Sequence, residues 1–131
     1  MPSRDSYGTI AQLARQTVLI VDDHSAFRQA TTALLEAEGF RVVGEAANGE
    51  EAIRAVALLR PEVVLLDIQL PRVDGLEVAE RLAARPDPPA IVLISSRSAA
   101  SYGRRLLRSP AKGFIAKDVL SGQAIAALLA P

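Results

Sequence analysis

The chain has 131 residues, which is enough for one domain of ordinary size but not for two. Half of its residues are hydrophobic, and 15 basic side chains balance 15 acidic ones, so the formal net charge is zero. A neutral chain argues against direct nucleic-acid binding and against a tail for anionic membranes. The sequence has no cysteine, which excludes disulfides and thiolate chemistry. With no secretory signal and no apolar run near the roughly 18 residues of a membrane span, we expect a cytoplasmic protein.

The chain starts with a weakly patterned stretch, residues 1–16, which we expect to be a flexible arm. The first dense apolar run, residues 18–21, predicts a strand that ends in Asp22 and Asp23. The apolar spacing that follows favours a helix, and Gly39 stands where such a helix stops.

The most informative stretch is the run of four branched apolar residues at 63–66, which ends abruptly in Asp67. A short run of this kind is typical of a parallel strand buried on both faces. Before it, the more polar residues 41–45 suit an edge strand, and a helix is expected between Asn48 and Pro61. In open α/β sheets, ligands bind at the carboxyl ends of the strands, which is where Asp67 would lie.

The second half of the chain repeats the alternation of strand and helix. Asp74 and the glycine after it are expected to open a helix, and residues 90–94 form a fourth apolar run that ends in Ser95. A helical stretch over about residues 99–108 follows, and Pro110 breaks it.

The last predicted strand covers residues 112–116 and ends in Lys117, after which Asp118 is expected to cap a final helix. Five strands that alternate with five helices predict right-handed crossovers and a parallel sheet. We therefore expect one flavodoxin-like α/β domain over residues 17–130, with strand order 2-1-3-4-5 and helices on both faces.

Five chemically useful side chains directly follow the predicted strands. They are Asp22, Asp23, Asp67, Ser95 and Lys117. Because the carboxyl ends of parallel strands share one rim, these side chains should converge on one cleft. Three carboxylates there repel one another, and Mg²⁺, which prefers oxygen ligands, relieves that repulsion.

Such a cleft is suited to receiving a phosphoryl group, because phosphoryl transfer depends on positioning and charge neutralisation. A carboxylate can be the nucleophile, and Asp67 is the best placed of the three. Asp22 and Asp23 are then metal ligands, Lys117 neutralises phosphoryl oxygens, and Ser95 donates a hydrogen bond to the arriving group.

The residues around these positions form recognisable motifs. They are Leu19-Ile20-Val21-Asp22-Asp23-His24, Val64-Leu65-Leu66-Asp67, Leu70-Pro71, Asp74-Gly75, Ser95-Ser96 and Gly113-Phe114-Ile115-Ala116-Lys117. As a set at this spacing, they resemble the receiver domain of bacterial two-component response regulators. The closest resemblance is to the NarL/FixJ type, whose members usually carry a carboxyl-terminal helix-turn-helix DNA-binding domain.

The resemblance implies that a sensor histidine kinase phosphorylates Asp67. It also implies that Asp23 ligates Mg²⁺ directly, that Asp22 does so mainly through water, and that Asp67 and the backbone carbonyl of Gln69 complete the protein ligands. Such a chain catalyses only its own phosphorylation and dephosphorylation, and it is not an enzyme with a turnover substrate.

The resemblance further implies that Ser95 is the switch hydroxyl and Phe114 the switch aromatic. Phe114 lacks the hydroxyl of the tyrosine frequent at this position, so a switch there is expected to act through packing alone. Gln69 and Arg97 flank the site, and we expect them to tune the lifetime of the phosphoryl group.

Several features leave alternatives open. His24 could be a metal ligand or only a residue at a helix start, and the arginines around residues 97–108 could be a solvated face or a partner surface. The alanines of the last helix leave a flat surface, which could form the interface of a homodimer on phosphorylation. Two other functions compete, namely a Mg²⁺-dependent phosphohydrolase with an aspartyl nucleophile and an interaction module that works without phosphorylation.

Overall fold

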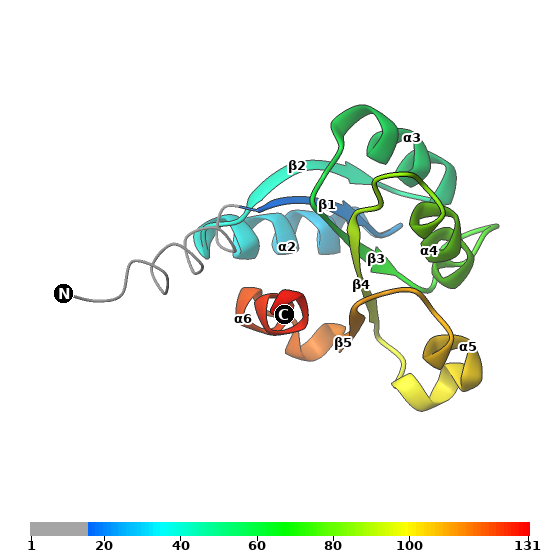
Figure 1. The fold of residues 1–131 in the computed structure, drawn as a ribbon. Coiled ribbons are helices and arrows are strands. Elements are labelled where there is room, and N and C mark those ends of the chain that lie inside the picture. The colour runs from blue at the N-terminus through cyan, green and yellow to red at the C-terminus, as the bar shows by residue number, and fades with distance from the viewer. Residues whose placement is uncertain (1–15) are drawn as a thin grey trace.

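The computed structural model describes residues 16–131, so all but the last residue of the predicted arm lies outside the described residues. Five parallel strands form one sheet in the order β2-β1-β3-β4-β5, which confirms the predicted topology (Figure 1). The strands are β1 (Thr17–Val21), β2 (Arg41–Ala46), β3 (Val63–Asp67), β4 (Ala90–Ser95) and β5 (Gly113–Ala116).

Helices cover both faces of this sheet (Figure 1). They are α2 (Ser25–Ala37), α3 (Gly49–Leu59), α4 (Gly75–Ala83), α5 (Arg104–Leu107) and α6 (Gly122–Leu129), with the 3-10 helices η1 (Ala99–Tyr102) and η2 (Lys117–Val119). Successive residues of a strand point to opposite faces, so each central strand contributes to two apolar clusters. One cluster packs against α3 and α4, and the other packs against α2 and α6.

The central strand β3 is buried along its whole length, from Val63 to Asp67. Its neighbours β1 and β4 pair with it residue by residue, so Leu66 stands beside both Val21 and Leu93. This register brings the ends of the three strands to the same level. The residues that follow them are thereby placed side by side.

Two of the predicted helix starts are confirmed by their capping hydrogen bonds. The side chain of Asn48 accepts a hydrogen bond from the amide of Glu51 at 2.9 Å, and Asp74 accepts one from the amide of Glu77 at 3.0 Å. Each bond satisfies an amide that has no partner inside its helix. The side chain of Glu51 also accepts a hydrogen bond from the amide of Ala47 at 3.1 Å, so the first of these helices has a reciprocal contact similar to a capping box.

Two predictions about the last third of the chain are wrong. The stretch 99–108 is not one helix, because Gly103 has a φ of 59° and separates η1 from α5. Asp118 does not cap the last helix but lies within η2, and Ser121 is the cap, accepting a hydrogen bond from the amide of Ala124 at 3.0 Å. A short turn thus delays the start of α6 by three residues.

Candidate functional site

Three of the predicted site residues meet at the carboxyl edge of the sheet. The ammonium of Lys117 donates hydrogen bonds to Asp22 at 2.5 Å and to Asp67 at 3.2 Å. Both carboxylates are almost completely buried, since the two residues are 0% and 1% exposed. The acids come from the ends of β1 and β3, and the lysine follows β5, so the sheet topology alone assembles this triad.

The side chain of Lys117 also contacts an aromatic ring. Its ammonium lies 4.3 Å from the centre of the Phe27 ring, which belongs to α2. A cation over an aromatic face is attracted by the ring quadrupole, and the ring also excludes water from one side of the ammonium. The lysine is therefore directed into the site by two carboxylates and one aromatic ring, and Phe27 had not been predicted as part of it.

The two buried carboxylates have opposite pKa shifts. Burial raises the pKa of Asp67 to about 6, against the lowering effects of the Gln69 amide and the Lys117 charge. Burial also acts to raise the pKa of Asp22, but hydrogen bonds from Lys117 and the His24 amide outweigh it, so that pKa is lowered. Burial acts to lower the pKa of Lys117, and its bonds to the two acids raise it overall. Asp22 is therefore the firmly ionised carboxylate of the site. Asp67 is the carboxylate whose negative charge the neighbouring groups neutralise incompletely.

The acid pair after β1 offers a group of ligand atoms beside this triad. Carboxylate oxygens of Asp22 and Asp23 and a ring nitrogen of His24 lie within 4.8 Å of one another. Asp22 is buried, whereas the Asp23 side chain is 36% exposed and can be reached from solvent. Hard oxygen ligands next to a buried carboxylate with a raised pKa are the donor set that suits Mg²⁺.

A second ion pair fixes the backbone of the acid pair. Arg28 of α2 donates to the carbonyl oxygen of Asp22 at 2.6 Å and to the Glu45 carboxylate of β2 at 2.8 Å. The amide of Asp22 donates to the carbonyl of Ala46 at 3.0 Å. The turn that presents Asp22 is therefore tied to both α2 and the edge strand, and the sequence pattern had not singled out Arg28.

The loop after β3 depends on a glycine. A side chain at Gly75 would place its Cβ 2.1 Å from the carbonyl oxygen of Asp67, a distance that no real contact allows. The close approach lets the Gly75 amide donate to the carbonyl of Ile68 at 2.8 Å. It also keeps the loop tight enough for the Gln69 amide to donate to the Asp67 carboxylate at 3.0 Å.

Ser95 lies at the end of β4, fully buried, and its hydroxyl has two partners. It accepts a hydrogen bond from the Arg97 amide at 3.0 Å and lies 2.5 Å from the hydroxyl of Tyr102. The Tyr102 ring packs at a tilt against Phe114, with ring centres 6.5 Å apart. Tyr102 is a residue that the sequence pattern placed only on the predicted helix, with no role at the site.

The residues predicted to tune the site contact it in different ways. The side chain of Gln69 accepts a hydrogen bond from the Ser96 hydroxyl at 3.2 Å, which links the loops after β3 and β4. Arg97 is exposed, and its amide donates to the Ser95 hydroxyl. Of the arginines around α5, Arg105 forms an ion pair with Asp74 at 2.8 Å.

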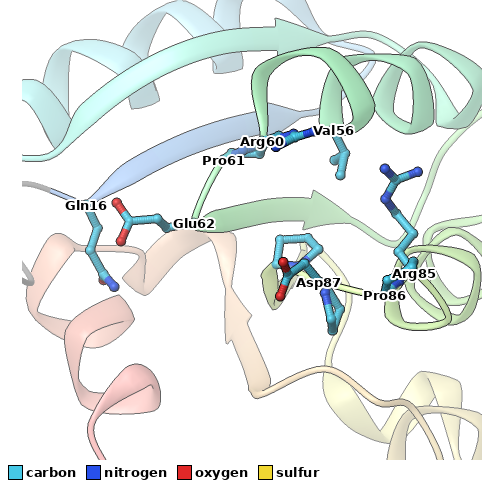
Figure 2. Close-up of a pocket in the computed structure, with 10 residues that line it drawn as sticks. Gln16, Val56, Arg60, Pro61, Glu62, Arg85, Pro86 and Asp87 are labelled. Atoms are coloured by element: carbon cyan, nitrogen blue, oxygen red, sulfur yellow. The ribbon is translucent and has the colours of Figure 1, made fainter.

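A cleft of about 660 Å³ lies at the amino ends of the strands, opposite the rim that holds the acids (Figure 2). Its walls include Gln16, Glu62 and Pro89, which stand just before β1, β3 and β4. Because the predicted site residues follow the strands, they lie at the opposite end, and none of them lines this cleft. The chemistry expected of the chain therefore belongs to the rim of acids, not to this hollow.

Comparison with known families agrees with the geometry of the rim. The family model described as the response regulator receiver domain matches residues 18–129. The chain belongs to the response regulator receiver domain family. The receiver domain of NarL from Mycobacterium tuberculosis superposes on this fold with a TM-score of 0.76, at 32% identity, over 88% of this chain and 94% of that one.

The relatives of this chain include a transcription regulator and an enzyme. The virulence-factor transcription regulator BvgA of Bordetella pertussis is 40% identical over 100 residues, which are 76% of this chain and 48% of that protein. The protein-glutamate methylesterase/protein-glutamine glutaminase 3 of Hahella chejuensis is 44% identical over 81 residues, 62% of this chain and 23% of that protein. The chain thus spans about half the length of the first of these, and less of the second.

The family fixes the general character of the receiver. Receiver domains bind Mg²⁺ at an acidic pocket of the kind formed here by Asp22 and Asp23, and they accept phosphoryl groups from sensor histidine kinases. Within residues 16–131, no helix is both long and apolar enough to cross a membrane.

Proposed function

We propose that this receiver accepts a phosphoryl group from a histidine kinase on Asp67 and controls an output through the resulting change of shape. The observation that carries the proposal is the buried Asp67 carboxylate, which is bonded to Lys117 and to the Gln69 amide and has an acid pair beside it. A carboxylate held in this way is oriented for attack, and its burial limits the water that would hydrolyse the product.

In the transfer step, an oxygen of Asp67 attacks phosphorus and forms a new O–P bond. The P–N bond to the kinase histidine breaks, and the leaving imidazole takes up a proton from solvent. Lys117 neutralises negative charge on the phosphoryl oxygens, since its ammonium already contacts Asp67. Asp22, Asp23, Asp67 and the Gln69 carbonyl would hold Mg²⁺, which when bound supplies further charge neutralisation.

The switch that follows involves the loop after β4. Ser95 donates a hydrogen bond to the phosphoryl group, Phe114 repacks, and the face formed by α5, β5 and α6 changes. This is a population shift between two states, biased by a local change of charge. Gln69 and Arg97 tune the lifetime of the phosphoryl group by controlling the approach of the hydrolytic water.

The output we propose is transcription, through a DNA-binding domain that the receiver controls. In this proposal the chain has no turnover substrate and forms a homodimer when it is phosphorylated. It works in the cytoplasm, where ATP supplies the kinase. The names of the regulators similar to it support the choice of output.

Mass spectrometry after incubation with acetyl phosphate and Mg²⁺ tests the central step. The wild-type chain should gain about 80 Da, as expected for one aspartyl phosphate, and the Asp67→Asn variant should gain nothing. Labelling of both proteins would remove Asp67 from its proposed role. Continuous turnover of p-nitrophenyl phosphate, measured in parallel, would instead favour a phosphohydrolase.

A further inference from the structure

The hydroxyl of Ser95 is engaged by groups other than the phosphoacceptor. Within residues 16–131 its hydrogen-bond partners are the Tyr102 hydroxyl and the Arg97 amide, and no hydrogen bond joins it to Asp67. Ser95 is fully buried, so water does not compete for this hydroxyl. The Arg97 amide donates to the serine oxygen, so that contact leaves the single hydroxyl proton of Ser95 unused. When this proton is donated to the Tyr102 oxygen, that bond must break before Ser95 can donate to a phosphoryl group on Asp67.

Tyr102 is positioned to hold Ser95 by features on both of its sides. Its ring packs against Phe114, with ring centres 6.5 Å apart and an angle of 55° between the planes. It is the last residue of η1, and the next residue, Gly103, has a φ of 59° with open space where a Cβ would be. The ring is therefore supported by packing, while the backbone beside it has the freedom to turn.

We propose that Tyr102 is a positioning residue whose hydroxyl holds Ser95 in the resting orientation and competes with the phosphoryl group for it. This inference rests on the proposed phosphorylation of Asp67. In this proposal the hydroxyl of the switch comes from Tyr102 of η1. The aromatic residue of β5, Phe114, has no hydroxyl to supply. The switch accordingly includes a hydrogen bond that must break, in addition to the change of packing.

The same segment is anchored at its far end to the loop that follows Asp67. Arg105, in the first turn of α5, pairs with the Asp74 carboxylate at 2.8 Å. Asp74 also caps α4, directly ahead of the glycine that packs on the Asp67 carbonyl. Release of Tyr102 therefore frees one end of a short segment whose other end stays tied to the phosphoacceptor loop.

Binding of beryllium fluoride with Mg²⁺, a mimic of an aspartyl phosphate, tests the inference at equilibrium. The ¹⁹F signal of the bound anion reports occupancy directly, and its half-saturating concentration is compared between variants. Tyr102→Phe keeps the ring but removes the hydroxyl, so more of the resting protein has Ser95 free. Because one neutral hydrogen bond is lost, the half-saturating concentration should fall by about three- to tenfold.

Three further variants separate this role from a general effect on structure. In a Ser95→Ala background, Tyr102→Phe should change nothing, because the hydroxyl it releases is absent. Ser98→Ala is the matched control, since it removes a hydrogen bond of the same loop, between Ser98 and Ser101 at 3.2 Å, that does not involve Ser95. Binding to wild type but not to Asp67→Asn is expected from the proposed function.

The outcomes are distinct. Unchanged or weaker binding by Tyr102→Phe, or an equal gain in the Ser95→Ala background, would overturn the role of Tyr102 and leave the phosphoacceptor intact. Absence of binding to wild type, or equal binding to Asp67→Asn, would overturn the proposed function and this inference with it.

Discussion

Replacement of Asp67 by asparagine should stabilise the metal-free protein at neutral pH, although it removes the proposed phosphoacceptor. Burial raises the pKa of this carboxyl to about 6 in the folded state. An aspartate in an unfolded chain has a pKa of about 3.9. The folded protein therefore carries a proton on Asp67 that the unfolded chain has already lost, over the interval between these two pKa values.

The sign and size of the effect follow from this difference. Because the folded state binds more protons in the interval, the free energy of unfolding falls as pH rises from about 4 to 6. Above about pH 6 the whole loss of stability caused by ionised Asp67 is present. A difference of about 2 pKa units corresponds to about 3 kcal/mol. The asparagine side chain cannot ionise, so the Asp67→Asn variant should exceed wild type by about 3 kcal/mol at pH 7.5 and by about half of that at pH 5.

Urea unfolding in the presence of EDTA, at pH 5 and pH 7.5, measures both differences. In wild type, against the effect of burial, the pKa of Asp22 is lowered and that of Lys117 is raised by their mutual hydrogen bond, so both stay ionised between pH 5 and 7.5 and the change of stability over this interval reports on Asp67. Asp118→Asn is the control, because it removes one exposed carboxylate close in sequence to the same lysine and should change stability by less than about 0.5 kcal/mol. A variant that is less stable than wild type at pH 7.5, or an advantage that does not grow with pH, would refute the reasoning.

Four other substitutions give three separate tests. Lys117→Met leaves two buried carboxylates without their cation and should cost about 3–5 kcal/mol in EDTA, and equal urea midpoints would contradict the role of this lysine. Because Ser121 caps α6, Ser121→Ala should lower the free energy of unfolding by about 1 kcal/mol, measured by thermal unfolding, and Asp118→Ala should hardly change it. A larger loss for Asp118→Ala than for Ser121→Ala would mean that the aspartate is the cap. Gly75→Ala forces a Cβ onto the carbonyl of Asp67 and should cost about 1–3 kcal/mol or more by urea unfolding, so a neutral result would mean that the loop relaxes freely.

Much of the fold and the centre of the site could be predicted because their signals are local. The apolar run that ends in Asp67 is short and continuous, and the alternation of strands and helices allows a parallel sheet with few other arrangements. Once the strand order is set, the residues after β1, β3 and β5 must share a rim. The contacts of Lys117 with Asp22 and Asp67 are therefore a consequence of topology that the sequence pattern already contained.

The cap of the last helix marks the limit of local rules. Asp118 and Ser121 are both good caps, and either could begin a helix that carries the apolar residues of α6. Asp118 lies inside the 3-10 turn of residues 117–119, so it is not the residue that precedes the helix. Lys117, the first residue of that turn, is hydrogen-bonded to Asp22 and Asp67, so contacts across the sheet, rather than capping preference, decide where the helix begins.

The sequence by itself determined the sheet order, the burial of β3 and the convergence of acids and lysine, because these follow from periodicity and from which residue ends each strand. Only the tertiary structure decided which groups surround them: the Phe27 ring against Lys117, the Arg28 contact behind Asp22 and the Tyr102 hydroxyl on Ser95. Such contacts join elements that pack at particular angles and depths. Side-chain packing across elements sets those angles, and no repeat along the chain encodes it.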